Sequence, residues 1–340
     1  MDYLATTPVD RRVLDAMLPY FCEQFGNASS ATHALGNDAA MAVAQARRQV
    51  AALLNARERE IVFTSGATEA NNLALKGVAE FVGRGHIITA QTEHKAVLDV
   101  CKSLARRGFS TTYLDVDQSG SIDVDALERA ITDETVMVSL MAANNEVGTL
   151  HPLAEIGALC KARGVLFHCD AAQAVGKIEI DVDAQGIDLL SLSAHKFYGP
   201  KGVGALYVRS RSPRVRLGAQ QDGGGQERGL RAGTLNVPGI VGLGAACQLA
   251  NIADPISLKC HFHDAQASRQ VDTMRTASKF QHPPPAAPDP LSLIMSNFPS
   301  ICFYCLNSVS ALDLQASLAG CAALAAPGRA GIEARSVPSR

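Results

Sequence analysis

The sequence has no apolar run as long as the roughly 20 residues that a membrane-spanning helix needs. Its first residues, Met1-Asp2-Tyr3, also lack the basic and apolar stretches of a secretory signal. These absences argue against an integral membrane protein and against an exported one. We therefore expect a cytoplasmic protein without a membrane partner.

An excess of charge of either sign is missing as well. Among the 340 residues, 31 are Lys or Arg and 33 are Asp or Glu, so no surface for nucleic acid is expected. The nine cysteines are scattered along the chain, and in a cytoplasmic protein we expect them to be reduced thiols. The length allows one large and one small domain.

Short apolar segments alternate with amphipathic ones between residues 40 and 250. Strand signals lie near 61–63, 86–90, 111–114, 135–141, 165–169, 188–193 and 203–208, and helical signals near 40–54, 68–82, 94–107, 123–131 and 152–163. This alternation predicts an α/β fold with a three-layer, mainly parallel, seven-stranded sheet, in which the segment 203–208 runs antiparallel. In such a sheet, ligands bind at the carboxyl ends of the strands.

Two of the predicted strands end in residues of opposite charge. The strand 165–169 ends in Asp170, and the strand 188–193 leads into Lys196. A lysine amine forms a Schiff base with the aldehyde of pyridoxal phosphate, and a carboxylate keeps the ring nitrogen of that cofactor protonated. A single lysine is usually only a surface residue. The pair at two strand ends predicts a pyridoxal 5'-phosphate site.

A glycine turn follows the first predicted strand. Residues 64–69, Thr-Ser-Gly-Ala-Thr-Glu, open a helical segment, and the free N–H groups and dipole at such a point suit a phosphate group. The alternative is an ordinary helix start capped by Thr64 or Ser65.

Three more polar positions fall at the same predicted edge. His94 opens the helical segment after strand 86–90, where it could stack on a planar ring or serve only as an exposed cap residue. Asn145 follows strand 135–141, and the glycine-rich, basic loop 223–234 ends in the hydroxyl of Thr234. Each signal is weak alone, but together they converge on one face of one sheet.

This order of motifs resembles the NifS-like cysteine desulfurases, pyridoxal-phosphate enzymes of the class V aminotransferase group. The resemblance begins at residues 2–10, passes through Gly26-Asn27-Ala28-Ser29-Ser30, and reaches about Ala250. It implies that Lys196 forms the Schiff base, that Asp170 pairs with the ring nitrogen, and that His94 stacks on the ring and moves protons. It also implies cofactor contacts for Ala67, Thr68, Asn145, Gln173, Ser193, His195 and, across a subunit interface, Thr234.

The last ninety residues differ from the rest. Nine of the fifteen prolines follow Ala250, a density that breaks helices and central strands. In the desulfurases this region carries a nucleophilic cysteine in a loop of serine, glycine and alanine, followed by an arginine that holds the substrate carboxylate. Neither motif is found here. Cys321 is the nearest counterpart of the cysteine, and Arg335 is only a position at which the arginine could fall.

We therefore divide the chain into an N-terminal segment (1–15), a large cofactor-binding domain (16–250) and a small, atypical or incomplete domain (251–340). The last part is either diverged or the product of a frameshift, and we favour the frameshift because the family pattern stops abruptly. The pairs Cys260/His263 and Cys302/Cys305 fit no standard zinc finger, so no metal site is predicted.

The implied function is that of a cysteine desulfurase, which converts L-cysteine to L-alanine and passes sulfur, as a persulfide, to an acceptor or iron–sulfur scaffold protein. A homodimer is implied by Thr234, and sulfur transfer is expected to be impaired because the nucleophile loop is missing. Two alternatives stay open: a selenocysteine lyase or other class V lyase or transaminase, and a non-catalytic remnant that binds the cofactor.

Overall fold

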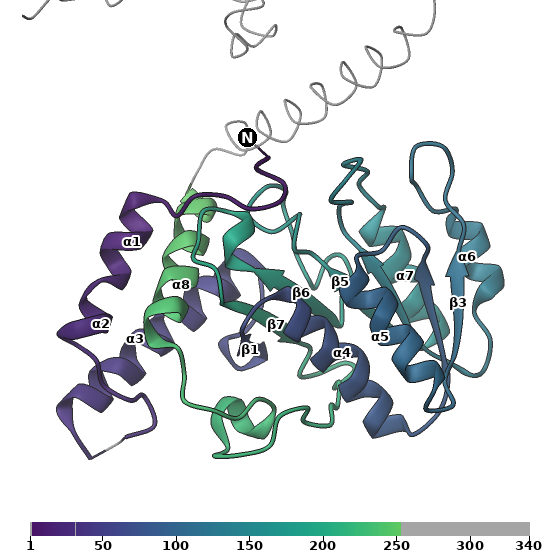
Figure 1. Cartoon of the computed structure of the whole chain (residues 1–340). Helices are drawn as coiled ribbons and strands as arrows, with labels where there is room; N and C mark the ends of the chain where they lie inside the picture. Colours follow the sequence, from purple (N-terminus) through teal and green to yellow (C-terminus); the bar gives the residue numbers. More distant parts are fainter. Residues whose placement is uncertain (1, 31, 253–340) are drawn as a thin grey trace, which may run out of the picture. The chain divides into compact units, whose positions relative to one another are not determined.

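The computed structural model describes residues 2–30 and 32–252. Within them the chain forms a seven-stranded sheet in the order β1-β7-β6-β5-β4-β2-β3 (Figure 1). The strands are β1 (Ile61–Thr64), β2 (His86–Ala90), β3 (Ser110–Leu114), β4 (Thr135–Met141), β5 (Leu166–Asp170), β6 (Leu189–Ser193) and β7 (Gly204–Val208). Only β7 of these seven runs against its neighbours, β6 and β1. The predicted parallel sheet and its antiparallel strand are confirmed.

Eight α-helices accompany the sheet in this part of the chain. They are α1 (Arg11–Met17), α2 (Pro19–Cys22), α3 (Ala34–Leu53), α4 (Ala67–Val82), α5 (Lys95–Ala105), α6 (Val124–Ala130), α7 (Leu153–Arg163) and α8 (Val237–Ile252). Three short 3-10 helices, η1 (Glu58–Glu60), η2 (Ala194–Lys196) and η3 (Gln226–Gly229), complete the regular structure. No helix among the described residues is long and apolar enough to span a membrane.

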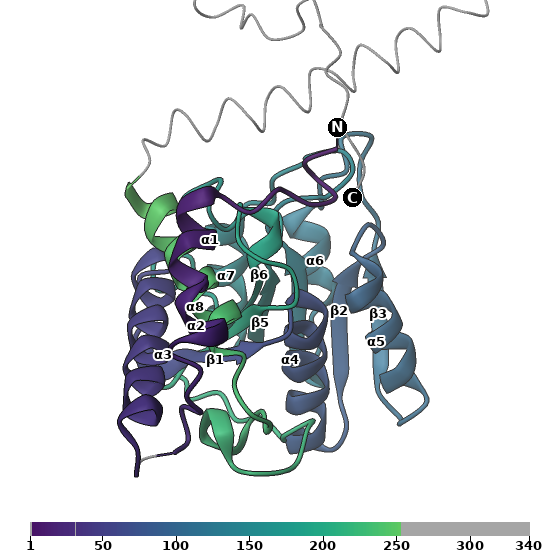
Figure 2. The ribbon, with the colours of Figure 1, turned by 60° about the vertical axis from the view of Figure 1, so that its left-hand side comes forward.

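The helices form two layers because successive strand residues point to opposite faces of the sheet. In β1, Ile61 and Phe63 join the core that α1, α3, α6, α7 and α8 cover, whereas Val62 joins the core under α4 and α5. Figure 2 shows α3 and α8 together on one side of the sheet and α4 on the other. With apolar cores on both faces, the inner strands are mostly buried, as a parallel sheet requires, whereas the edge strand β3 is largely exposed.

Several helix predictions need correction. The helix expected over 40–54 begins six residues earlier, at Ala34, and α1, α2 and α8 were not predicted. The early start of α3 contains Gly36 and Asn37, which are poor helix formers. Packing outweighs that weakness, because α3 lies along α8, and Gly36 abuts the carbonyl of Ser30 too closely to admit a side chain.

The carboxyl ends of β1, β2, β4, β5 and β6 meet at one edge of the sheet, as their shared direction requires. This edge therefore receives every chemically active strand end that the sequence indicates. The predicted segment 1–15 ends inside α1. The predicted segment 251–340 lies outside the described residues except for its first two positions, and so do Cys321, Arg335 and the rejected zinc pairs.

Candidate active site

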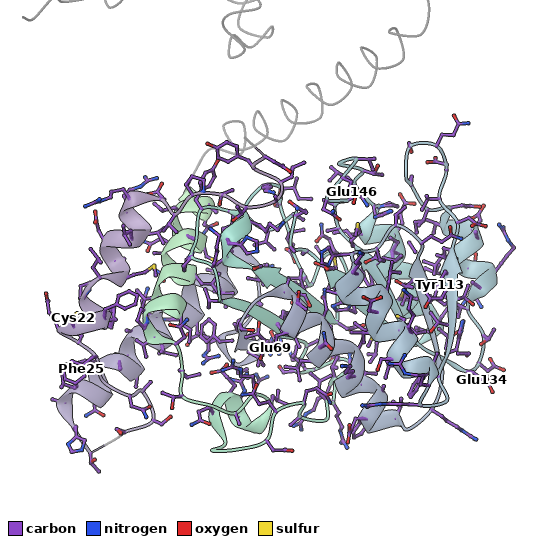
Figure 3. The ribbon with its side chains drawn as sticks, in the orientation of Figure 1. Cys22, Phe25, Glu69, Tyr113, Glu134 and Glu146 are labelled. Carbon is purple, nitrogen blue, oxygen red and sulfur yellow. The ribbon has the colours of Figure 1, made fainter. Side chains whose placement is uncertain are left out.

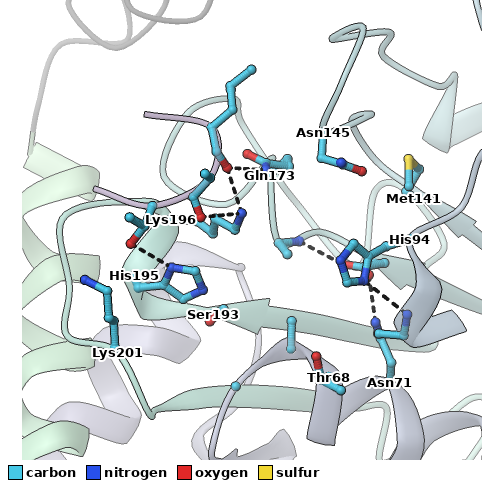
Figure 4. Close-up of a pocket in the computed structure, with 18 of the residues that line it drawn as sticks. Thr68, Asn71, His94, Met141, Asn145, Gln173, Ser193, His195, Lys196 and Lys201 are labelled. Atoms are coloured by element: carbon cyan, nitrogen blue, oxygen red, sulfur yellow. Dashed lines mark hydrogen bonds between the residues drawn. The ribbon is translucent and has the colours of Figure 1, made fainter. Parts of the chain in front are cut away.

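A cavity of about 930 Å³ opens at this edge of the sheet (Figure 4). Nine of the ten cofactor-binding residues predicted from the sequence line it, namely Ala67, Thr68, His94, Asn145, Asp170, Gln173, Ser193, His195 and Lys196. The tenth, Thr234, is exposed and is not part of the lining. Segments from residue 67 to residue 196 are thus brought together in one place.

Asp170 ends β5 with its carboxylate almost completely buried, at 5% exposure. One carboxylate oxygen accepts a hydrogen bond from the Asn71 side-chain amide at 2.7 Å, and the other accepts one from the Ala172 N–H at 3.0 Å. Burial raises the pKa of Asp170 above its usual value, while these two bonds and the nearby His94 and Lys196 oppose that rise. The carboxylate is therefore fixed in direction and faces the cavity.

Lys196 ends η2, and its amine is held by backbone rather than by a side-chain acid. The Nζ atom donates to the carbonyl of Leu4 at 2.7 Å and to that of Ala5 at 3.0 Å. Burial lowers the pKa of Lys196, and the charges of Asp170 and Asp2 only partly offset that effect. A lowered pKa increases the share of free amine, which is the form that attacks an aldehyde.

The turn before α4 has the geometry of an anion cradle. Gly66 stands at the N-cap of the 16-residue α4 with φ at 151°, a value that favours glycine, and no side chain caps the helix. Thr64 turns its hydroxyl to the Gly66 carbonyl at 3.0 Å, and the Ser65 N–H donates to Glu69. The alternative of a cap by Thr64 or Ser65 is therefore wrong, and the helix start is open toward the cavity.

Basic residues on the segment between β6 and β7 face the cradle. His195 and Lys201 line the same cavity, and the buried Ser193 lies between the cradle and η2 (Figure 4). Burial lowers the pKa of His195, and the charges of Lys196, Lys201 and Lys177 lower it further. A neutral imidazole among three lysines leaves the region positive, which suits a phosphate dianion.

Gly204 holds β7 against the cradle. A Cβ atom there would lie 2.7 Å from the Gly66 Cα and even closer to the Leu192 carbonyl oxygen. Only glycine allows the three backbones to approach in this way, so the first residue of β7 sets the position of the cradle.

His94 is the N-cap residue that one interpretation of the sequence expects, and its stacking on a planar ring stays a prediction. Its Nδ1 accepts a hydrogen bond from the Ala96 N–H at 3.1 Å, which makes it the N-cap of α5. The ring also lines the cavity (Figure 4), and its charge acts on the nearby Asp170. Because Nδ1 accepts a bond, the ring proton belongs on Nε2.

Gln173 and Asn145 lie at the rim opposite the cradle (Figure 4). The Gln173 amide donates to the Leu4 carbonyl at 2.8 Å, and its oxygen accepts from the Lys177 amine at 2.8 Å. Gln173 and Lys196 therefore both bind the Leu4 carbonyl, which fixes the N-terminal segment across the mouth of the cavity.

Two buried residues at the site were not predicted. Asn71 orients Asp170, and Glu93 accepts a bond from the Met141 N–H at 2.7 Å, joining the ends of β2 and β4. Burial raises the pKa of Glu93 well above its usual value, and the charge of Asp170 adds to the rise. Burial raises the pKa of both carboxyl groups, but the rise is opposed more strongly at Asp170, which has two hydrogen-bond donors and the nearby His94 and Lys196, than at Glu93, which has one donor.

No cysteine among the described residues lines the cavity. Cys101, Cys160, Cys169 and Cys247 are buried, and burial raises the pKa of Cys101 and of Cys160 to about 12. Cys22 is exposed on α2. None of these five thiols has the setting of a reactive nucleophile at this site.

These residues fit pyridoxal phosphate. An open helix start with basic neighbours is present for the phosphate, a fixed carboxylate for the ring nitrogen, and a lysine amine between them for the aldehyde. The three groups border one cavity, which is the combination that pyridoxal phosphate requires.

Comparisons with known proteins agree with this chemistry. A family model described as "Aminotransferase class-V" matches residues 1–293, which extends past Ala250, where the motifs of the sequence stop. The protein named cysteine desulfurase IscS in Anaeromyxobacter sp. (strain Fw109-5) is 61% identical over 254 residues, which make up 74% of this chain and 63% of that protein. Cysteine desulfurase of Mus musculus is 59% identical over 252 residues, 74% of this chain and 55% of that protein. The chain thus spans less than two thirds of these relatives.

Solved structures show the same likeness. A structure described as "NIFS-LIKE PROTEIN" superposes with a TM-score of 0.71 at 45% identity, covering 74% of this chain and 69% of the other. Another, "SspA in complex with cysteine", gives a TM-score of 0.70 at 47% identity and covers 73% and 71%. Pyridoxal phosphate is the cofactor of this family, in agreement with the prediction from Lys196 and Asp170. By sequence, fold and site, the chain belongs to the class-V aminotransferases and is similar to their NifS-like cysteine desulfurases.

Proposed function

We propose that this protein is a pyridoxal-phosphate-dependent cysteine desulfurase that acts on L-cysteine. The observation that carries the proposal is the placement of the Lys196 amine and the Asp170 carboxylate on one cavity with the α4 cradle. The relatives named cysteine desulfurase and the neighbour solved with cysteine support this substrate.

The residues that line the cavity have different roles toward the cofactor. When bound, pyridoxal phosphate supplies an aldehyde carbon for the substrate amine and a ring that accepts electrons. Asp170 would keep a proton on the ring nitrogen, because its carboxylate is fixed by Asn71 and Ala172. Ala67, Thr68, Ser193 and His195 would hold the phosphate, Gln173 would bond the ring hydroxyl, and Asn145 would contact the ring.

Two nitrogen groups reach the cavity for proton transfer at the substrate. The Lys196 amine, with its lowered pKa, is the base that takes the Cα proton, and the carbonyls of Leu4 and Ala5 accept the ammonium that results. His94 reaches the cavity from the N-cap of α5 and, with its proton on Nε2, is a proton donor to the substrate.

The sulfur step needs a thiolate from the protein. That thiolate takes the substrate sulfur, so that the cysteine C–S bond breaks, alanine leaves, and the protein keeps a persulfide for an acceptor such as an iron–sulfur scaffold. None of the described thiols lines the cavity. Among the cysteines outside the described residues, we assign this role to Cys321, because its position in the sequence is the nearest counterpart of the family's nucleophile. Its surroundings lack the serine-rich loop of the desulfurases, so we expect slow transfer.

Alanine formation from L-cysteine tests the proposal. We expect a change in the visible spectrum on addition of L-cysteine, with alanine and sulfide release far below that of a full desulfurase, and Cys321→Ser should abolish the remainder. Robust turnover that survives Cys321→Ser would assign the sulfur step to another thiol. Turnover of selenocysteine but not of cysteine would favour a selenocysteine lyase, and bound cofactor with neither activity would favour a remnant.

We further propose a homodimer with its active sites at the interface. The exposed hydroxyl of Thr234, outside the cavity of its own chain, supports this proposal because the residue is free to reach the phosphate of a partner subunit. The cytoplasmic location stays a prediction of the sequence.

A further inference from the structure

The loop 221–234, which carries Thr234 at its end, is fastened to the large domain at two points. Figure 1 shows it below β1 and α4, and Figure 3 labels Glu69 on the side of α4 that faces it. One fastening point is Glu227, inside the loop, and the other is Glu69, outside it. Both are carboxylates that bind an arginine and a backbone N–H together.

Glu227 fastens the loop to the edge strand of the sheet. Its carboxylate receives Arg47 through two bonds of 2.7 and 2.6 Å and the N–H of Phe63 in β1 at 2.8 Å. Arg47 and Arg228 both donate to the Ile61 carbonyl, so side chains satisfy the edge that a further strand would otherwise pair.

The backbone at this first point is strained. Glu227 and Arg228 have φ values of 47° and 59°, a region that residues other than glycine rarely adopt. The Glu227 side chain is nevertheless buried, at 6% exposure. The contacts with Arg47 and β1 therefore outweigh the cost of the conformation, which fixes the loop in one position.

Glu69 connects the loop to the cradle itself. One of its oxygens accepts the N–H of Ser65 at 2.8 Å, and the other accepts the Arg231 Nε at 2.8 Å. Burial raises the pKa of Glu69, but the bonds from Arg231 and Ser65 outweigh it and hold the pKa below its usual value. One ionised carboxylate thus bonds to the turn that begins the cradle and to an arginine three residues before Thr234.

Hydrogen bonds within the loop fix the position of Thr234 relative to Arg231. Gln221 and Ala232 exchange two hydrogen bonds, of 2.8 and 3.2 Å, and the Gly233 N–H donates to Gln226 at 2.9 Å. Little freedom is left between Arg231 and Thr234.

We propose that Glu69 and Arg231 form a clamp that positions the cradle and the Thr234 loop relative to each other, and so set the affinity for the cofactor phosphate. The proposal rests on the proposed pyridoxal phosphate function. Both are positioning residues, because Glu69 acts through the Ser65 N–H and Arg231 acts through the loop. In the proposed dimer the cradle belongs to the subunit's own site and Thr234 to the partner's site, so breaking the pair in both subunits should loosen two parts of each phosphate site.

The test compares Arg231→Met with a matched control. Arg163→Met breaks an ion pair with Glu128 of similar length, 2.6 Å, on the exposed ends of α7 and α6. We expect Arg231→Met to weaken pyridoxal phosphate binding about tenfold and Arg163→Met to change it less than twofold. In a Thr234→Ala background, the effect of Arg231→Met should shrink to about twofold, because the clamp acts partly through that hydroxyl.

Hydrogen exchange of the cofactor-free protein gives a second readout. Arg231→Met should speed exchange of the Ser65 and Gly233 amides together, and the control should leave both unchanged. A wild type that takes up no pyridoxal phosphate would overturn the proposed function and, with it, the role in cofactor affinity. A wild type that binds the cofactor while Arg231→Met behaves like Arg163→Met, in affinity and in exchange, would overturn the clamp alone.

Discussion

At the residue scale, the site is built from a few groups whose environments set them apart from chemically similar neighbours. Lys196 and Asp170 could be predicted because each stands at the end of an apolar strand. Asn71 and Glu93 could not, because their partners are a carboxylate 99 residues away and a backbone N–H 48 residues away. Contacts of that kind leave no local pattern in a sequence.

The two buried carboxyl groups give a first prediction. Asp170→Asn should keep the fold but lower alanine formation from L-cysteine at least 100-fold, because a neutral amide cannot hold a proton on the ring nitrogen. Glu93→Gln is the matched control, and it should change cofactor affinity less than twofold because burial raises the pKa of Glu93 and so favours its neutral form. Cofactor titrations and turnover assays check both variants. Equal losses of affinity and turnover in the two variants would contradict a role for Asp170, and not for Glu93, as the charged partner of the ring nitrogen.

His168 gives a prediction for stability. The ring is fully buried in β5 between the hydroxyls of Ser139 and Ser191, and burial lowers its pKa from 6.5 to about 3. Between these pH values the unfolded chain binds a proton that the folded chain excludes. The unfolding free energy should therefore fall as the pH drops from 6.5 toward 3, by up to about 1.4 kcal/mol per unit.

Denaturant titrations across that range, on the wild type and on His168→Gln, test this account. The variant should lose stability overall but show the weaker dependence on pH, since its side chain does not titrate. Parallel curves for the two proteins would show that His168 does not contribute.

At the element scale, the strands and crossover helices follow from hydrophobic periodicity, whereas the connections do not. The glycine turn before α4 was predicted, but the role of Gly204 was not, because it arises from the approach of three backbones. The loop 223–234 was predicted, but its conformation around η3 was not. Glu227 and Arg228 adopt left-handed conformations there that their residue types do not favour, and only their distant partners explain them.

Gly204→Ala tests how closely β7 holds the cradle. The added methyl group would press on Gly66 and on the Leu192 carbonyl, so we expect pyridoxal phosphate to bind at least tenfold more weakly. Gly164→Ala is a suitable control. It strains the end of α7, at a φ of 67°, but meets no atom within 4 Å and lies away from the cavity. If both variants lose affinity equally, the effect is one of general stability.

At the scale of the whole molecule, the described layers place nine of the ten predicted cofactor-binding residues at one edge of one sheet, and this much followed from the alternation of strands and helices. The oligomeric state could not be predicted from this alternation. Thr234 lies outside the cavity of its own chain, so its predicted contact with the cofactor requires a second subunit.

Light scattering should therefore give twice the mass of the 35.8 kDa chain. Thr234→Ala should weaken pyridoxal phosphate binding about fivefold, the equivalent of about 1 kcal/mol for one hydrogen bond, without dissociating the dimer. A monomer that binds the cofactor as tightly as a dimer would contradict the shared site.

The central claim is that Lys196 carries pyridoxal phosphate, and one measurement tests it most directly. The protein is loaded with the cofactor, reduced with borohydride and digested, and the labelled peptide is identified by mass. We predict a pyridoxyl group on Lys196 alone, and none on Lys196→Ala. A label on Lys177 or Lys201, the other lysines near the site, or a wild type that takes up no cofactor, would contradict the account.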